Sequence, residues 1–397
     1  MRTRIFEIWH DIAKRYGFQF YDGPPLEPLD LFTKKSGDEI VGQLYNFTDK
    51  GGRAVSLRPE MTPTVARMVA ARERHYKKPI KWYSIPQLFR YERQQKGRLR
   101  EHFQFNADIF GEDDPAADAE LIALLIDVLR GFRLTADDFV IRLSSRNAWQ
   151  DFFTKHCSDE SKAYDFYQIV DKLERTPPEE SDKKLQALGF SLEQVRGFID
   201  GGEPTGELQA VLDSLGARGL SDFVKIDYNV IRGLAYYTGV VYEAFDRKGE
   251  FRAIAGGGRY DQLVGLVSNG KKEMPAAGFA MGDVVLAELL KERDLLWSHC
   301  SDVSIYVMIE DESTRSSAIG MVQQLRAAGW GVEFSLVPLK PDKQFKRARE
   351  LDVDFVLHAL PEDRVRVKAL ATRAESEVAS GEISDYLQME LLKLAQD

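Results

Sequence analysis

Polar and apolar residues alternate with the two-residue period of β-strands between positions 83 and 111. The apolar phase carries Phe103, Phe105, Ala107 and Ile109. The polar phase continues through a turn at residues 94–97 and carries Arg90, Glu92, Arg100, His102, Gln104, Asn106 and Asp108. We therefore expect a β-hairpin with one apolar face. A solvated face would alternate in the same way, but two arginines with an amide and carboxylates favour a surface that binds an anion and a zwitterion.

Helical and strand patterns surround this hairpin. Apolar residues at helical spacing predict a helix from Ile5 to Tyr16 that ends at Gly17. The other expected elements are a strand at 54–58, a helix starting at Thr62-Pro63, a helix from Asp113 to Leu129 and a strand at 139–143. The first core is therefore predicted to be an antiparallel sheet with helices.

The pattern changes to short, charged helices between residues 147 and 220, with breaks at 176–178, 189 and 201–202. Strands are expected again at 224–230, 239–245 and 251–255, followed by a glycine-rich turn and a helix at 284–291. We interpret 147–220 as a helical insertion in one sheet domain that comprises residues 1–146 and 221–299.

The last hundred residues alternate strands with helices. Strands are expected at 303–309, 332–336, 355–358 and 365–367, with helices at 313–328 and 342–351. This order predicts a small α/β domain at 300–397 with a mostly parallel sheet.

Composition narrows the function classes. The net charge of −9 argues against a protein that coats nucleic acid, although residues 90–100 and 340–349 form local basic patches. No apolar run could span a membrane, and no N-terminal signal pattern is visible, so we expect a cytoplasmic protein. The two cysteines lack metal-binding spacing and the six histidines are scattered, so no metal site is expected.

Glu60 lies where a predicted strand gives way to a helix, in the segment LRPEMT at 57–62. Its carboxylate could bind a substrate ammonium. A charge that satisfies the helix dipole is the alternative.

The hairpin offers complementary groups. Arg90 could hold a phosphate or carboxylate, while Gln104 and Asp108 could bind polar hydrogens of a smaller group. The basic tip at 95–98 could touch a phosphodiester backbone, or it could be a plain surface turn.

Two further segments carry candidate ligand groups. In RGLAYYTG, at 232–239, Arg232 precedes two tyrosines, which could orient a polar ligand or form a turn with packed aromatics. In AGGGRYD, at 255–261, three glycines allow close approach to a ligand, but the spacing matches neither a Walker loop nor a dinucleotide fingerprint.

Taken in order, LRPEMT, FRYERQQKGR with FQFNADIFG, RGLAYYTG, AGGGRYD and GFAMG resemble the histidyl-tRNA synthetases, a class II aminoacyl-tRNA synthetase family, over nearly the whole chain. RGLAYYTG is similar to a motif that separates this family from other class II enzymes. The resemblance implies an antiparallel sheet flanked by helices, a helical insertion and a C-terminal α/β anticodon-binding domain.

The resemblance also implies a two-step reaction. Histidine would attack the α-phosphate of ATP to give histidyl-adenylate, and the acyl group would then move to the 3′ end of tRNA(His). ATP would be a substrate that arrives with Mg²⁺, and no organic cofactor is implied. A homodimer is implied as well.

Roles for individual residues follow from the same motifs. The resemblance implies catalytic roles for Arg90 and Arg232, and ATP binding by Arg90, Glu92, Arg98 and Arg232. It implies histidine binding by Glu60, Thr62, Gln104, Asp108, Tyr236, Tyr237 and Tyr260. Contacts to tRNA are implied for Gln95, Lys96, Arg98, Lys343 and Lys346.

One departure from the family pattern concerns the triphosphate. Val285 stands where the third class II motif usually carries an arginine, which leaves Arg98 or Arg259 as candidates for that contact. The alternative function is a synthetase-like regulatory subunit of ATP phosphoribosyltransferase, which does not charge tRNA. Such paralogues usually lack the anticodon domain and have a degraded RGLAYYTG region, whereas this chain retains both features.

Overall fold

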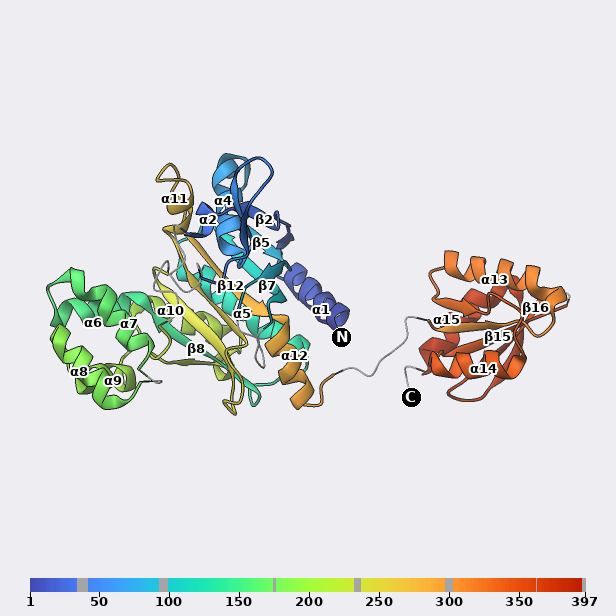
Figure 1. The fold of residues 1–397 in the computed structure, drawn as a ribbon. Helices are drawn as coiled ribbons and strands as arrows, with labels where there is room; N and C mark the ends of the chain where they lie inside the picture. The colour runs from blue at the N-terminus through green and yellow to red at the C-terminus, as the bar shows by residue number, and fades with distance from the viewer. Residues whose placement is uncertain are drawn as a thin grey trace. The chain divides into compact units, whose positions relative to one another are not determined.

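The computed structural model describes residues 1–33, 42–92, 99–173, 176–231, 237–296, 303–361 and 363–394. The chain forms two compact units, Met1–Leu296 and Trp297–Asp397. Figure 1 shows both units with their helices and strands. Each unit is described by itself below.

Among the described residues, the first unit contains a nine-stranded sheet in the order β1-β5-β7-β12-β11-β10-β8-β9, with β6 also paired to β7. The β1–β5 and β8–β9 pairs are parallel and the other pairs are antiparallel. The strands are β1 (Gln19–Phe20), β5 (Ile80–Ser84), β6 (Gln87–Phe89), β7 (Glu101–Phe110), β8 (Phe139–Ser145), β9 (Val224–Ile226), β10 (Val240–Asp246), β11 (Ala255–Arg259) and β12 (Ala276–Gly282).

The two strands of the expected hairpin are β6 and β7, and its predicted turn at 94–97 lies outside the described residues. Gln87 pairs with Phe103 and Phe89 with Glu101, and the Arg90 amide donates to the Arg100 carbonyl at 2.9 Å. In the apolar phase of β7, Phe105, Ala107 and Ile109 are almost fully buried as predicted, whereas Phe103 is only partly buried. The ring of Trp9, on α1 (Arg2–Arg15), packs 5.7 Å from that of Phe105. Helix α5 (Pro115–Gly131) also contacts β7 and β12.

The glycine-rich segment was predicted to be a turn, and this was wrong. Its residues form β11, between β10 and β12. A Cβ at Gly257 would lie 2.5 Å from the carbonyl oxygen of Gly278, and a Cβ at Gly258 would lie 2.7 Å from that of Val240. The glycines therefore allow the neighbouring strands to approach, and the pattern carried no alternation from which a strand could be predicted.

Several smaller elements pack around this sheet. A second sheet has the order β2-β4-β3, from β2 (Leu26–Pro28), β4 (Ala54–Leu57) and β3 (Asn46–Thr48). The helices here are α2 (Asp30–Thr33), α4 (Thr62–Arg72), α11 (Leu263–Val267) and α12 (Asp283–Glu292), with the 3₁₀ turn η1 (Glu73–His75). Helices α4 and α11 share one apolar cluster with Tyr21, Phe110 and Tyr260.

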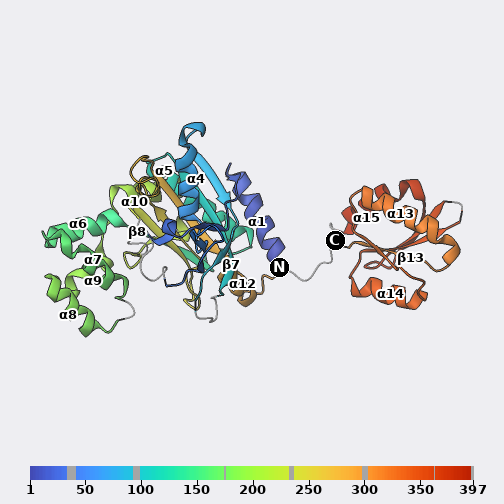
Figure 2. The same ribbon diagram turned by 45° about the horizontal axis from the view of Figure 1, so that its top comes forward.

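The segment between β8 and β9 is helical, and both views show α6 to α9 grouped beyond β8 (Figures 1 and 2). Aromatic rings hold this group together; the Phe166 and Phe190 centroids are 4.4 Å apart. Helix α10 packs on α5 of the core. The elements are α6 (Arg146–His156), η2 (Glu160–Lys162), α7 (Ala163–Asp171), α8 (Pro178–Leu188), α9 (Leu192–Gly201), α10 (Gly206–Ala217) and η3 (Ser221–Phe223).

The second unit contains a five-stranded sheet in the order β14-β13-β15-β16-β17. Figure 2 shows α13 and α15 on one side of it and α14 on the other. Its elements are β13 (Ile305–Met308), η4 (Glu312–Thr314), α13 (Arg315–Ala327), β14 (Val332–Phe334), α14 (Pro341–Glu350), β15 (Phe355–Leu360), β16 (Arg364–Ala369), β17 (Glu375–Ala379), η5 (Ser380–Glu382) and α15 (Ile383–Leu394).

The expectation of a mostly parallel sheet was wrong for half of its strand pairs. Strand β13 is parallel to β14 and β15, but β15–β16 and β16–β17 are antiparallel. Only a short link joins Leu360 to Arg364, and a parallel pair requires a crossover of a dozen or more residues. Strand β17 and helix α15 were not predicted.

Candidate active site

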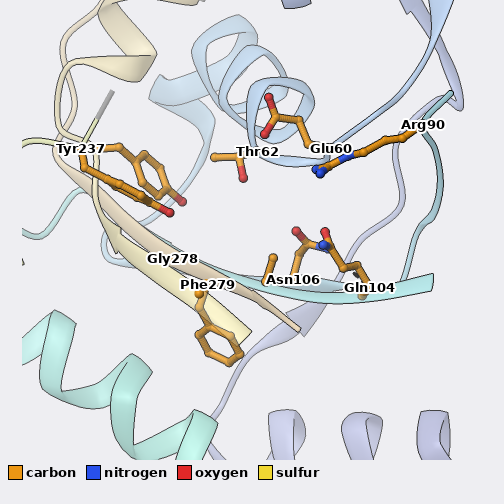
Figure 3. Close-up of a pocket in the computed structure, with 11 residues that line it drawn as sticks. Glu60, Thr62, Arg90, Gln104, Asn106, Tyr237, Gly278 and Phe279 are labelled. Carbon is orange, nitrogen blue, oxygen red and sulfur yellow. Dashed lines mark hydrogen bonds between the residues drawn. The ribbon is translucent and has the colours of Figure 1, made fainter. Parts of the chain in front are cut away.

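A cavity of about 380 Å³, including its open mouth, lies on the polar face of the large sheet. Strands β7, β11 and β12 form its floor, and the start of α4 and the link after β6 form its walls (Figure 3). Its lining residues are Glu60, Thr62, Arg90, Gln104, Asn106, Tyr237, Gly256, Tyr260, Gly278, Phe279 and Ala280.

Arg90 brings a positive charge to one side of the cavity. Its Nε donates to the carbonyl oxygen of Pro59 at 2.9 Å, which fixes the side chain while leaving the outer guanidinium nitrogens directed toward the cavity beside Glu60 (Figure 3). His102 follows on the same strand face. Burial, and then the charge of Arg90, lowers the pKa of His102 to about 4, so the imidazole is neutral near pH 7. Arg90, and not His102, therefore supplies the positive charge on this side of the cavity.

Glu60 and Thr62 face Arg90 from the segment that leads into α4 (Figure 3). Arg58 holds this segment in place. Its side chain is 5% exposed, and it donates from Nε to the Gln87 carbonyl at 3.0 Å and from Nη1 to the Gly23 carbonyl at 2.6 Å. The carboxylate of Glu60 is thus presented from a segment that is tied to two neighbouring chain segments.

Tyr260 and Asp108 form a buried pair below the cavity. The Tyr260 hydroxyl donates a hydrogen bond to Oδ1 of Asp108, and the two residues are 1% and 2% exposed. Burial raises the pKa of Asp108 to about 7, against the opposing effect of the tyrosine hydrogen bond. A side chain at Gly278 would clash with both partners, so this glycine makes the space that the pair occupies. Because the Tyr260 hydroxyl already donates its hydrogen to Asp108, its oxygen can accept a hydrogen bond from a ligand.

Arg259, beside Tyr260, points away from the cavity and was wrongly considered as a triphosphate contact. It is 6% exposed, and its Nε lies 3.0 Å from Oδ2 of Asp118, which is fully buried. It also donates to the carbonyl oxygens of Glu112 and Asp114 at 3.0 and 3.2 Å. Burial lowers the pKa of Arg259, but Asp118 outweighs this and raises it overall. Its donors are engaged within the protein, so it cannot replace the arginine missing at Val285.

The same segment fixes the second tyrosine of the cavity. Next to Tyr237, Thr238 donates its backbone amide to the Arg259 carbonyl at 2.7 Å and its hydroxyl to Oδ2 of Asp261 at 2.9 Å. Tyr237 and Tyr260, whose ring centroids are 6.4 Å apart, are therefore held by one hydrogen-bonded frame.

The structure brings together six residues that the sequence predicted for the site: Glu60, Thr62, Arg90, Gln104, Tyr237 and Tyr260. Asp108 lies directly behind Tyr260. Glu92 does not line the cavity, and Lys343 and Lys346 lie on α14 of the other unit. Five predicted residues lie outside the described part of the chain: Gln95, Lys96, Arg98, Arg232 and Tyr236.

Sequence reasoning missed Asn106 as a cavity residue, together with the floor residues Gly278, Phe279 and Ala280, whereas Gly256 belongs to the glycine run for which close approach to a ligand was considered. Asn106 was placed on the polar face of the hairpin but was given no role. Phe279 contributes only backbone, because Figure 3 shows its ring on the far side of β12. Floor residues of this kind leave no signal in side-chain chemistry.

A family model described as histidyl-tRNA synthetase matches residues 1–283. The histidine–tRNA ligase of Opitutus terrae is 46% identical over 95% of this chain and 92% of its own length. That of Leptospira biflexa is 35% identical over 99% and 95%. A solved histidyl-tRNA synthetase from Nostoc has a TM-score of 0.81 at 22% identity and covers 98% of this chain and 95% of its own.

The fold, the cavity and these matches define an aminoacyl-tRNA synthetase. The chain belongs to the histidyl-tRNA synthetase family.

Proposed function

We propose that this protein activates histidine with ATP to form histidyl-adenylate and transfers the histidyl group to the 3′ end of tRNA(His). The observation that supports this most directly is one cavity that combines the cation of Arg90 with the carboxylate of Glu60 and the buried Tyr260–Asp108 pair. These groups are complementary to a phosphate, an ammonium and a ring that carries hydrogen-bonding nitrogens.

Histidine is bound as a zwitterion in this proposal. Glu60 and Thr62 receive its ammonium group, and Gln104 binds its carboxylate. Tyr237 and Tyr260 line the imidazole, with Asp108 fixing the orientation of the Tyr260 hydroxyl. An apolar amino acid would leave these buried groups without partners, a penalty of about 10⁴-fold or more in comparable synthetase sites.

The activation step needs alignment and charge stabilisation. A carboxylate oxygen of histidine forms a bond to the α-phosphorus of ATP, and the bond to the departing pyrophosphate breaks. Arg90 stabilises the negative charge that develops on the α-phosphate. ATP arrives with Mg²⁺ as its counterion. We assign a second cation to Arg232 and further ATP contacts to Glu92 and Arg98, from the family resemblance.

Binding of tRNA is assigned to two further groups of residues. We assign Gln95, Lys96 and Arg98 to the acceptor end. Lys343 and Lys346, on the basic helix α14, are assigned to the anticodon region, with residues 300–397 as the anticodon-binding domain. A homodimer in the cytoplasm completes the proposal. No helix among the described residues is long and apolar enough to cross a membrane.

The regulatory subunit of ATP phosphoribosyltransferase is the alternative. The curated relatives that match over nearly the whole chain are ligases, which favours the enzyme. Histidine-dependent exchange of labelled pyrophosphate into ATP tests the activation step. We expect exchange with histidine and none with phenylalanine; a folded protein without exchange at saturating ligands would exclude the proposal.

A further inference from the structure

Three buried polar atoms lie behind the Tyr260–Asp108 pair and have no hydrogen-bond partner among the described residues outside their own group. They are the Tyr21 hydroxyl, the Ser84 hydroxyl and the second carboxylate oxygen of Asp108, Oδ2. The three residues are 8%, 1% and 2% exposed. Buried polar groups without partners are rare in folded proteins, so three close together indicate a functional requirement.

Strand register places these residues on one face of the sheet. In the β5–β7 pair, Trp82 is opposite Asp108 and Ser84 is opposite Asn106, and residues directly opposite each other share a face. The Tyr21 amide donates to the Tyr83 carbonyl at 2.9 Å. The Tyr21 ring stacks on Trp82 with centroids 5.3 Å apart. The Tyr21 ring therefore lies on the cavity side of the sheet, over the residue paired with Asp108.

Electrostatics agree with this placement. Burial raises the pKa of Tyr21 well above its ordinary value, and the charge of Asp108 raises it further. A hydrogen bond with Ser84 and the charge of Arg58 lower this pKa, and Asp22 raises it. The Tyr21 hydroxyl therefore keeps its proton near neutral pH. A protonated hydroxyl beside a carboxylate oxygen is a hydrogen-bond donor.

We propose that Tyr21 is a positioning residue whose hydroxyl donates to Oδ2 of Asp108 when bound histidine favours the ionised carboxylate. Tyr260 holds Oδ1, and Tyr21 holds Oδ2. The carboxylate is then fixed at both oxygens, which in turn fixes the Tyr260 oxygen that meets the imidazole. This inference rests on the proposed function, because it assigns the imidazole to this end of the cavity.

The alternative is that Tyr21 merely fills space against Trp82. Removing its hydroxyl would then leave ligand binding unchanged. Tyr242 provides a matched control. It is also fully buried with an unpartnered hydroxyl, but it precedes Glu243, whose side chain meets the cavity-lining Gly256, so it points to the opposite face of the sheet.

The experiment measures pyrophosphate exchange by the full-length wild type, Tyr21→Phe and Tyr242→Phe while histidine and ATP are varied separately. We expect Tyr21→Phe to raise KM for histidine about tenfold, in line with the loss of a hydrogen bond to a charged group, while KM for ATP and Tm change little. Tyr242→Phe should change neither KM. An unchanged KM for histidine in Tyr21→Phe would overturn the proposal. A wild type without exchange would instead overturn the proposed function on which it rests.

A double-mutant cycle checks that Tyr21 acts through Asp108. In an Asp108→Asn background, we expect Tyr21→Phe to add less than twofold to KM for histidine. A further tenfold increase in that background would show that Tyr21 acts independently and would overturn the positioning role.

Discussion

Tyr260 and Asp108, 152 positions apart in the sequence, are joined by a buried hydrogen bond in which the tyrosine is the donor. The bond crosses from the end of β11 to β7, over the glycine of β12 that makes room for it. It orients a hydroxyl oxygen toward the cavity as an acceptor, and it places a carboxyl group of raised pKa immediately behind that oxygen. In the proposed function, recognition of the histidine ring depends on this hydrogen bond.

The raised pKa of Asp108 predicts a pH-dependent cost in stability. The carboxyl group ionises near pH 3.8 in the unfolded protein but near 7 in the folded protein. Its contribution to the stability of the fold is therefore fully present below about pH 4 and is lost as the pH rises through 7. Asp108→Asn, which still accepts from Tyr260, should therefore raise the free energy of unfolding at pH 8 by roughly 3 kcal/mol, with little gain at pH 4. Urea unfolding of both proteins at the two pH values measures this. Equal gains at both values would contradict the assignment.

Replacing Arg90 should affect chemistry more than folding. Its Nε anchors to the Pro59 carbonyl, while the rest of the guanidinium faces the cavity. We expect Arg90→Ala to lower the exchange rate by about 10²–10³-fold, as for other groups that stabilise transition-state charge. The control is Arg130→Ala, which removes an exposed ion pair with Asp127. Similar rates in the two variants would refute the role of Arg90.

Two glycines of the cavity floor should respond differently to the same substitution. A Cβ at Gly278 would clash with Asp108 and Tyr260, whereas a Cβ at Gly256 would meet nothing closer than Glu243 Oε1 at 3.6 Å. Gly278→Ala should therefore destabilise the protein by about 1–3 kcal/mol. Gly256→Ala should keep the wild-type Tm but raise KM for a substrate, because its methyl group enters the cavity. Thermal melts with exchange kinetics test both, and equal Tm losses would contradict this description of the floor.

The Arg259–Asp118 pair is expected to be structural. Asp118→Asn leaves the buried guanidinium only the partly exposed Asp261 as a counter-charge, so we expect a loss of about 3 kcal/mol, the lower end for a broken buried pair. The matched surface variant Glu180→Gln breaks the exposed pair with Lys184 and should cost less than 1 kcal/mol, roughly the most that such pairs contribute. Urea unfolding compares them. If the two losses were the same, the buried pair would not hold the frame around Tyr237 and Tyr260.

The hairpin shows how far the sequence could predict this site. Its two-residue alternation predicted the apolar face of Phe105 and Ala107 and the polar face of Gln104 and Asp108, because a strand imposes that period on side chains that must be buried on one face. Glu60 and Tyr237 were candidate ligand groups in their own segments, and only the motif resemblance assigned them to the same site. Nothing in the spacing of residues 60, 104 and 237 shows that three separate segments meet.

The missed features have a different physical origin. Strands β11 and β12 form the floor of the cavity with glycines, which have no side chains. A run of glycines is also typical of a turn, so the sequence predicted a turn there. Arg259 looked like a ligand group because its partner Asp118 lies 141 positions away, and no local pattern reports that pairing. The antiparallel half of the second sheet depends on the short link at residues 361–363, which periodicity alone does not register.

Aminoacylation of tRNA(His) transcript with radiolabelled histidine tests the central claim most directly. The account predicts ATP-dependent formation of histidyl-tRNA by the full-length protein and no labelling of a phenylalanine tRNA with phenylalanine. Pyrophosphate exchange without any charging of tRNA(His), in folded protein with intact transcript, would contradict the proposed function.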